Sequence, residues 1–450
     1  SADPFFYPAA PTDNLDYQRL LVYLSQCTEE QITTILAIVE AYIRTYKSNA
    51  EAGDHYTPRE VIELCIDLMI SDNVESMKKD GKIIRVYDSC CGTGGMLTTM
   101  KRKLSDPQDG LGIPRENIRL YGQDVNPEAY AVCCAEMLML DENPQNIREG
   151  NTLTEDRFPG EKFDLLITNP PFGVEWKTEK STVERELKQP NNRFMAGTPR
   201  VSDGQLLFLQ NLLAKAEDDA RIAIILNGSP LFSGDAGSGE SEIRRYVLEN
   251  HLLEAIIALP DQMFYNTGIF TYIWILSKKP NLRRKNKIQL IDATAMFVPQ
   301  TPKSLGNKRK FIDDDNRAKI VSEYKAFRES KMTKIFDADD FGYTKVTIEC
   351  PLYDEKGHRI VKRGSVQVDP KRRDTETIPL KQDIEQYIKS EVLPYFPDAF
   401  PDRSKDKIGY EIPFTRYFYQ YVPPRKSADI LNEIIANEKI VQKSLKEVLK

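Results

Sequence analysis

Between residues 83 and 280, short runs of isoleucine, leucine and valine alternate with segments that have apolar residues at helical spacing. The apolar runs occur in "IIRVYDS", "IRLYGQD", "FDLLITN", "RIAIILN", "LLEAIIALP" and "TYIWILSKK". Near-continuous apolar strands separated by helices are typical of a mostly parallel sheet that is covered on both faces. The pattern predicts an α/β fold with a doubly wound sheet, in which ligands bind beyond the carboxyl ends of the strands.

This alternating region divides the chain. We predict a partial N-terminal helical region at residues 1–52, a catalytic domain at 53–280, an accessory mixed α/β region at 281–425 and a C-terminal amphipathic helix at 426–450. The last helix has apolar residues at heptad-like spacing, and it either packs on its own chain or contacts a partner subunit. The sequence begins Ser-Ala-Asp and its first methionine is Met69, so we expect further N-terminal structure to precede residue 1.

Composition narrows the classes of function. No apolar run approaches the roughly 20 residues of a membrane helix, and no leader is apparent, so the cytoplasm is the expected location. With three scattered histidines and seven cysteines that form no CxxC pair, we expect no metal. The net charge of −6 means that any contact with nucleic acid requires a local basic patch or a partner.

A helix is predicted in "HYTPREVIELCIDLMI", ahead of the first strand. Thr57 followed by Pro58 resembles a side-chain cap with proline in the first helical turn. One face of the predicted helix is apolar and should be buried; it comprises Val61, Leu64, Cys65, Leu68 and Met69.

A glycine-rich loop follows the first strand in "VYDSCCGTGGM". Asp88 stands at the strand end, and Gly92, Gly94 and Gly95 allow the backbone to approach a ligand closely. The spacing is GxGG, unlike the GxGxxG of dinucleotide-binding folds, and Asp88 would repel a pyrophosphate. An acid at this position suits a ligand with an ammonium group and no phosphates, such as S-adenosylmethionine, although a plain tight turn can have the same sequence.

The second strand ends in "LYGQDVNP" with another acid, Asp124. A carboxylate after the second strand usually accepts hydrogen bonds from ribose hydroxyls. A helix cap is the alternative for an isolated strand-end acid, but the order of the two motifs favours a nucleoside-containing ligand.

The strand "FDLLIT" runs directly into Asn169-Pro170-Pro171-Phe172. The prolines stiffen the turn and remove backbone donors, so the Asn169 amide and the Pro170 carbonyl present acceptor oxygens. Two acceptors can hold both protons of an exocyclic amine and direct its lone pair toward an electrophile. Phe172 offers a face for stacking a planar base, which must be flipped out of a duplex to reach it.

Together these motifs resemble the amino-methyltransferases that modify adenine in DNA, with the gamma order of motifs. More particularly, the chain resembles the modification subunit of type I restriction-modification systems. The resemblance covers most of the chain and rests on "GDHYTPREV", "DSCCGTGGM", "GQDVNP", "NPPFG", "DGQLLFLQNLL", "AIILNGSPLF", "NTGIFTYIWILSKK", "LGNKR" and "IGYEIPFTRYFYQYVPP".

The resemblance implies a Rossmann-like S-adenosylmethionine-dependent methyltransferase and assigns its site residues. The catalytic residues would be Asn169, Pro170, Pro171 and Phe172. The cofactor-binding residues would be Tyr56, Thr57, Pro58, Asp88, Ser89, Gly92, Thr93, Gly94, Gly95, Asp124, Asn151 and Asn169. Ser89-Cys90 replaces a common Pro-Ala, which should be tolerated. Asn151 stands where the family often has aspartate, and because an amide brings no negative charge, the role of Asn151 is left open.

The resemblance also implies partners. They are double-stranded DNA, a specificity subunit with target-recognition domains, a second copy of this chain and, outside the modification complex, a separate restriction or translocase subunit. The chain has no GxxxxGK[ST] phosphate loop, so any DNA cleavage would belong to another polypeptide.

Three other interpretations are consistent with the sequence. The enzyme could methylate a protein glutamine or an RNA base, since Asn-Pro-Pro with an aromatic residue also occurs in such enzymes. It could be a non-catalytic, cofactor-binding scaffold of a defence complex. Residues 281–425, which contain basic clusters, could themselves recognise DNA.

Overall fold

The structure is a computed structural model that describes Thr28 and residues 56–448, apart from 73, 80, 301–305, 363, 420 and 422–425. Apart from Thr28, the helical region predicted for residues 1–52 lies outside the described residues.

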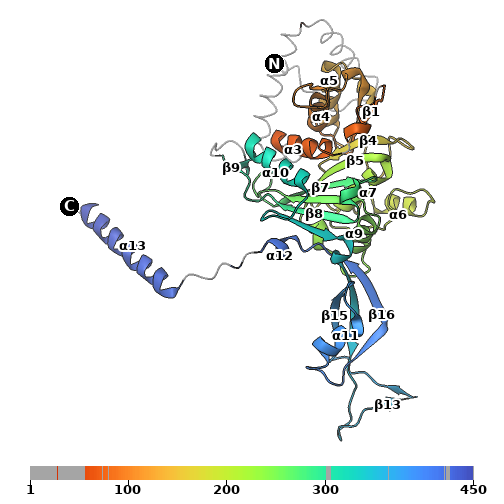
Figure 1. Ribbon diagram of the computed structural model, residues 1–450, viewed down its shortest axis with the longest axis vertical. Helices are drawn as coiled ribbons and strands as arrows, with labels where there is room; N and C mark the ends of the chain where they lie inside the picture. The colour runs from red at the N-terminus through yellow and green to blue at the C-terminus, as the bar shows by residue number, and fades with distance from the viewer. Residues whose placement is uncertain are drawn as a thin grey trace, which may run out of the picture. The chain divides into compact units, whose positions relative to one another are not determined.

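A nine-stranded sheet forms the centre of the molecule (Figure 1). Neighbouring strands of the sheet are parallel with two exceptions. β7 runs antiparallel to β5 and β6, and β11 runs antiparallel to β8. The order across the sheet is β11 (Thr333–Asp337), β8 (Lys287–Asp292), β6 (Leu253–Ala258), β7 (Thr271–Ser277), β5 (Ala216–Asn227), β4 (Phe163–Thr168), β1 (Ile84–Asp88), β2 (Ile118–Asp124) and β3 (Ile147–Glu149). The predicted doubly wound, mostly parallel α/β fold is confirmed.

All six apolar runs found in the sequence form strands of this sheet: β1, β2, β4, β5, β6 and β7. The sheet also continues past residue 280, where we expected the catalytic domain to end. β8 pairs in parallel with β6, and β11 pairs with β8. Residues 287–337 therefore supply two strands of the central sheet, ahead of the separate accessory strands.

Four helices cover one face of the sheet. They are α3 (Arg59–Ile70), α4 (Gly95–Ser105), α5 (Pro127–Met139) and α10 (Asp314–Ala326), and α3 lies beside α10 in Figure 1. Their apolar side chains form one core with alternate residues of the strands, as the period of two requires. The predicted apolar face of α3 is confirmed, because its five residues are fully buried in this core.

Further helices follow the strands on the chain. These are α6 (Lys180–Leu187), α7 (Gln205–Lys215), α8 (Ser229–Phe232) and α9 (Gly239–Glu249), with 3₁₀ turns η2 (Val74–Ser76), η3 (Arg115–Asn117), η4 (Pro144–Asn146) and η5 (Leu282–Arg284). α7 packs on β5 and is buried along almost its whole length. The sheet is thus covered on more than one side, which explains why its central strands are apolar throughout.

The accessory region contains a three-stranded antiparallel sheet in the order β15 (Asp374–Pro379), β12 (Gly342–Glu349) and β16 (Phe400–Tyr410). A small core joins this sheet to α11 (Ile384–Tyr387) and to the π-helical turn η7 (Ile388–Val392). The remaining elements are η6 (Ala338–Phe341) and two hairpins, β9 (Val298–Pro299) with β10 (Lys310–Phe311), and β13 (Val361–Lys362) with β14 (Ser365–Val366).

Residues from 414 onward form a second unit with two helices, α12 (Phe414–Phe418) and α13 (Ser427–Val448). The helix predicted near the C-terminus is therefore present. Its exposed apolar side chains are Ile430, Leu431, Ile434, Ile435, Ile440 and Val441. Within the described residues, no helix combines the length and the apolar character needed to span a bilayer.

A buried ion pair inside the central sheet provides a test of this core. Arg221 of β5 and Glu254 of β6 are 0% and 1% exposed, and Tyr324 of α10 donates to the same carboxylate at 2.8 Å. We expect Glu254→Ala to lower the free energy of unfolding by about 3–5 kcal/mol, because Arg221 is left buried without its counter-ion.

Urea unfolding of both proteins measures this difference. The control is Glu242→Ala, which removes an exposed partner of Arg245 on α9 and should change stability by less than about 0.5 kcal/mol. A loss for Glu254→Ala no larger than that of the control would contradict the expectation.

Candidate active site

The predicted site residues lie at the carboxyl edge of four adjacent parallel strands. In the order β4-β1-β2-β3, the residues at or just beyond the strand ends are Asn169, Asp88, Asp124 and Asn151. The strands are in parallel register, with Asp88 opposite Gly122 of β2. The topology therefore brings together residues that are up to 81 positions apart in the chain, from Asp88 to Asn169.

Asp88 is a buried carboxylate, 1% exposed. Its Oδ1 accepts hydrogen bonds from the Thr168 hydroxyl at 2.7 Å and from the backbone N–H of Cys90 at 3.0 Å. Burial, with a smaller contribution from the charge of Asp124, raises the pKa of Asp88 to about 7, although the two hydrogen bonds oppose the increase. Among the described residues no cation pairs with Asp88, so the site favours a cationic ligand group that would stabilise its charged form.

The glycine loop is fixed to the second strand. Asp124 accepts hydrogen bonds from the backbone N–H groups of Gly92 and Asn126, both at 2.8 Å. Gly94 has φ of 86°, and a Cβ atom there would lie 2.9 Å from the sulfur of Cys133, so only glycine fits. Ser89, Thr93 and Gly95 complete the loop, and Gly95 begins α4.

The amide of Asn169 is oriented by the residue that we predicted to cap α3. Its Nδ2 donates to the hydroxyl of Thr57 at 2.9 Å. The predicted cap is wrong: α3 begins at Arg59 after Pro58, and no side chain caps it. The Thr57 hydroxyl instead accepts a hydrogen bond from a residue 112 positions away.

The other amide atom, Oδ1 of Asn169, is buried and has no hydrogen-bond partner among the described residues. A buried oxygen without a donor costs free energy, commonly about 1–3 kcal/mol. Such an atom at the edge of a sheet indicates a place where a ligand donor binds.

The residues after Asn169 form a rigid, partly apolar wall. Pro170 is buried, whereas Pro171 and Phe172 are half-buried. The ring of Phe172 packs edge-on against that of Phe264, with 5.8 Å between the centroids. This contact holds the ring in place and leaves part of it accessible to a ligand.

Asn151 bonds with the protein through both ends of its amide. Its oxygen accepts from the backbone N–H of Leu153 at 2.9 Å, and its nitrogen donates to the carboxylate of Glu179 at 3.0 Å. Glu179 lies at the start of α6, in the segment that follows Phe172. A carboxylate is thus present beside Asn151, although the strand itself does not supply it.

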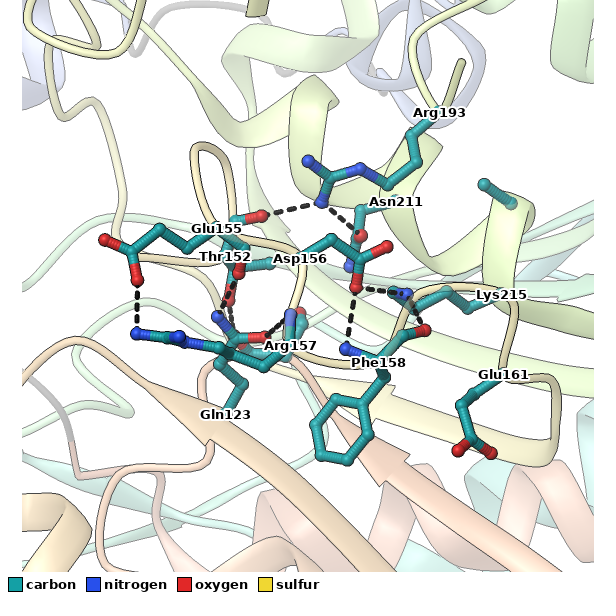
Figure 2. Close-up of polar contacts among 12 residues, drawn as sticks. Gln123, Thr152, Glu155, Asp156, Arg157, Phe158, Glu161, Arg193, Asn211 and Lys215 are labelled. Atoms are coloured by element: carbon teal, nitrogen blue, oxygen red, sulfur yellow. Dashed lines mark hydrogen bonds and ion pairs between the residues drawn. The ribbon is translucent and has the colours of Figure 1, made fainter. Parts of the chain in front are cut away.

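A network of buried polar groups holds the loop after β3, as Figure 2 shows. Arg193 donates to the carbonyl oxygens of Thr152 at 2.7 Å and Leu153 at 3.2 Å. Gln123 donates to the carbonyl oxygen of Glu155 at 2.7 Å, and the Thr152 hydroxyl donates to the carbonyl oxygen of Ser89 at 2.6 Å. These bonds fix the loop that carries Asn151 relative to the glycine loop.

The sequence did not single out Thr168, Thr152, Gln123 or Arg193. Thr168 directly precedes Asn169, and a polar residue at the end of an apolar strand is a signal that could have identified it. Arg193 lies in a polar segment with many charged residues. Nothing in this part of the sequence indicates that its side chain is buried, with only 8% exposed. Among the described residues, no group of three or more His, Cys, Asp or Glu side chains is placed to hold a metal ion.

The chain is similar to known proteins of one family. The family model described as N-6 DNA Methylase matches residues 32–353. The MjaIX type I restriction enzyme methylase subunit of Methanocaldococcus jannaschii is 24% identical over 76% of this chain and 58% of its own length. The MjaVII methylase subunit of the same organism is 28% identical over 70% of this chain and 52% of its own length.

The fold has counterparts among solved structures. The crystal structure of a type I restriction-modification methyltransferase subunit from Streptococcus thermophilus aligns with a TM-score of 0.55 and 24% identity, over 67% of this chain and 59% of that chain. This likeness supports the Rossmann-like fold. The chain spans somewhat more than half the length of the curated relatives that it matches.

The buried carboxylate gives a pH-dependent prediction for the ligand-free protein. The folded-state pKa of Asp88, about 7, lies above its ordinary value of 3.8. Its contribution to stability is therefore largest below about pH 4 and is lost as the pH rises to about 7. Asparagine does not ionise, so Asp88→Asn avoids this loss of stability. The free energy of unfolding of the variant, relative to that of wild type, should therefore be higher at pH 8 than at pH 5 by roughly 1–3 kcal/mol.

Urea unfolding without ligand at pH 5, 6, 7 and 8 measures the effect. Asp109→Asn, an exposed position in the loop after α4, controls for the loss of one negative charge. The same difference between Asp88→Asn and wild type at every pH would contradict the assignment.

Proposed function

The chain belongs to the N-6 DNA methylase family, whose model matches more than half of its 450 residues, and from this premise we propose that it methylates adenine in DNA. The methyl group would pass from S-adenosylmethionine to the exocyclic 6-amino group of a flipped-out adenine. The observation that carries the proposal is the buried, unpartnered Oδ1 of Asn169 at the carboxyl edge of the sheet.

The site residues suit S-adenosylmethionine. When it is bound, its sulfonium supplies an electrophilic methyl group. Asp88 would accept hydrogen bonds from the ammonium group of the cofactor, because it is a buried carboxylate without a cation partner among the described residues. Asp124 would accept hydrogen bonds from the ribose hydroxyls, since among the described residues each of its oxygens accepts one backbone N–H and retains a further lone pair.

The remaining walls of the cofactor site would come from two loops. Tyr56, Thr57 and Pro58 precede α3 and reach the site through the contact of Thr57 with Asn169. Asn151 and Glu179 lie beyond the end of β3. Because the strand order is β4-β1-β2-β3, a ligand with its reactive end at β4 and its ribose at β2 extends its base toward β3.

The chain's own residues would bind and align the target amine. The Oδ1 of Asn169 and the carbonyl of Pro170 accept its two protons, which orients the nitrogen lone pair away from both acceptors. As the nitrogen gains the methyl group, the methyl–sulfur bond would break and the cofactor would leave as a neutral thioether. The amine, now positively charged, would release a proton to water, so no strong base is required. Most of the acceleration would come from alignment and from acceptors that stabilise the developing positive charge.

The target base would stack on Phe172. Its ring is held edge-on by Phe264 and stays half-exposed, so a flipped base can cover its free face. The family match favours DNA over the alternative substrates, a protein glutamine or an RNA base, and the intact Asn169 to Phe172 segment argues against a scaffold without activity.

We propose that the chain acts as the modification subunit of a type I complex. Its partners would be a specificity subunit that reads double-stranded DNA, a second copy of this chain and a separate restriction or translocase subunit. Two curated relatives are methylase subunits of type I restriction enzymes. The apolar side chains of α13 suit contact with the specificity subunit, since α13 exposes six of them along its length.

Substitutions of Asn169 and Asp88 should separate catalysis from cofactor binding. Asn169→Ala should lower the rate of methyl transfer at least about 100-fold, because it removes an acceptor that acts on the reacting amine. Its dissociation constant for S-adenosylmethionine should stay close to the wild-type value. Asp88→Asn should instead weaken cofactor binding strongly, because an amide does not attract an ammonium group.

Calorimetry with S-adenosylmethionine and a methyl-transfer assay with unmodified genomic DNA measure both effects. The matched control is Asp219→Asn, a carboxylate near the amino end of β5 that pairs with Lys82 ahead of β1, at the opposite edge of the sheet. Loss of cofactor binding in Asn169→Ala would mean that this residue is assigned to the wrong ligand.

The proposed complex has its own test. The isolated chain should bind S-adenosylmethionine but methylate duplex DNA poorly until a specificity subunit is added. Sequencing of modified bases after incubation with each combination identifies the product. Site-specific methylation at full rate by the isolated chain would contradict the need for a separate specificity subunit.

A further inference from the structure

The side-chain amide of Asn169 has two polar atoms, and among the described residues only the nitrogen has a hydrogen-bond partner. Its Nδ2 donates to the Thr57 hydroxyl at 2.9 Å, whereas its Oδ1 is buried without a partner. Thr57 is itself buried, 7% exposed, and precedes α3 on a part of the chain remote from β4. The amide nitrogen and oxygen have nearly the same shape, so hydrogen bonds decide the orientation of the amide; the bond from Nδ2 to Thr57 leaves Oδ1 as the free acceptor.

A buried ion pair fixes the segment that carries Thr57. Glu60 in the first turn of α3 is 6% exposed and is bonded to Lys308, which is 2% exposed. Lys308 also donates to the carbonyl oxygen of Met263 at 2.9 Å. Both charged groups are buried, so separating them would leave a charge without a partner and without water. The ion pair therefore fixes the position of Glu60 relative to Lys308.

The segment of Lys308 also supports the other side of Thr57. The backbone N–H of Asn307 donates to the carbonyl oxygen of Tyr265 at 2.7 Å, and the ring of Tyr265 packs against that of Tyr56 with 5.5 Å between the centroids. Gly306 permits this approach, because it has φ of 56° and a Cβ atom there would lie 2.3 Å from the same carbonyl oxygen. Residues on both sides of Thr57 are therefore tied to residues 306–308.

We propose that Thr57 is a positioning residue that orients the amide of Asn169, and that the ion pair between Lys308 and Glu60 holds Thr57 in place. This inference rests on the proposed function, because it assigns the free Oδ1 of Asn169 to the target amine. It changes the predicted role of Thr57, from a residue that contacts the cofactor to one that acts through the catalytic amide.

Thr57→Val and Thr57→Ser test the first part. Valine keeps the shape but removes the acceptor, so the turnover number of the complete complex at saturating S-adenosylmethionine should fall about 10- to 100-fold. Serine keeps the hydroxyl and should restore most of the activity. The dissociation constant for S-adenosylmethionine should stay within about threefold of wild type in both variants, since the hydroxyl is engaged by Asn169.

The matched control is Thr333→Val, which removes a buried hydroxyl that donates to Glu323 outside the site. It should leave turnover unchanged, which excludes a general effect of losing a buried hydroxyl. A raised dissociation constant with unchanged turnover in Thr57→Val would overturn the proposal and return Thr57 to the cofactor site.

A measurement without substrate separates this inference from the proposed function. The side-chain amide resonance of Asn169 can be assigned by its absence in Asn169→Ala. In the ligand-free chain, Thr57→Val should shift this resonance and speed its hydrogen exchange, because the acceptor is lost. An unchanged resonance would overturn the inference even if DNA is methylated, whereas a wild-type complex that methylates no DNA overturns the proposed function alone.

Lys308→Met tests the second part. It leaves the Glu60 carboxylate buried without its cation, so it should shift the Asn169 resonance and lower turnover in the same direction as Thr57→Val. Adding Glu60→Gln removes the unpaired charge and should restore part of the loss. Wild-type turnover and an unshifted resonance in Lys308→Met would overturn this part.

Discussion

The site depends on a hydrogen bond between two strand ends, from the hydroxyl of Thr168 to the carboxylate of Asp88. It links β4, which delivers Asn169, to β1, which delivers the glycine loop. The backbone N–H of Gly92 then ties this loop to Asp124 of β2, and the Thr152 hydroxyl ties it to the loop after β3. Four strand ends are thereby joined by side chains, in addition to the backbone bonds of the sheet.

Sequence patterns were sufficient for the apolar strands and for the acids at their ends, because a strand buried on both faces has little freedom in composition. β8 was missed as part of the sheet since Gln289 interrupts its apolar run, although that side chain is fully buried and bonded to Arg284. Thr57 was misread for a different reason. A cap is a local pattern, whereas its actual partner, Asn169, is distant in the chain and becomes adjacent only in the folded protein.

The accessory region shows why basic clusters in a sequence are weak signals for nucleic acid. Arg372 pairs with Asp398, and both Arg373 and Lys405 pair with Glu349. These acids are distant in sequence from the basic residues that they neutralise. The pairing supports the interpretation of a solvated, charge-balanced surface, and it is consistent with a division of labour in which another subunit reads DNA.

The position of Glu179 connects the two halves of the proposed reaction. Glu179 follows the Asn169 to Phe172 segment by only a few residues, yet it bonds to Asn151 at the end of β3, on the far side of β1 and β2. One continuous segment therefore starts at the proposed target base and returns to the proposed cofactor edge. This segment therefore supplies a negative charge beside Asn151, beyond the end of β3. Because the same segment contacts both edges, a displacement of the segment at one edge would also move residues at the other.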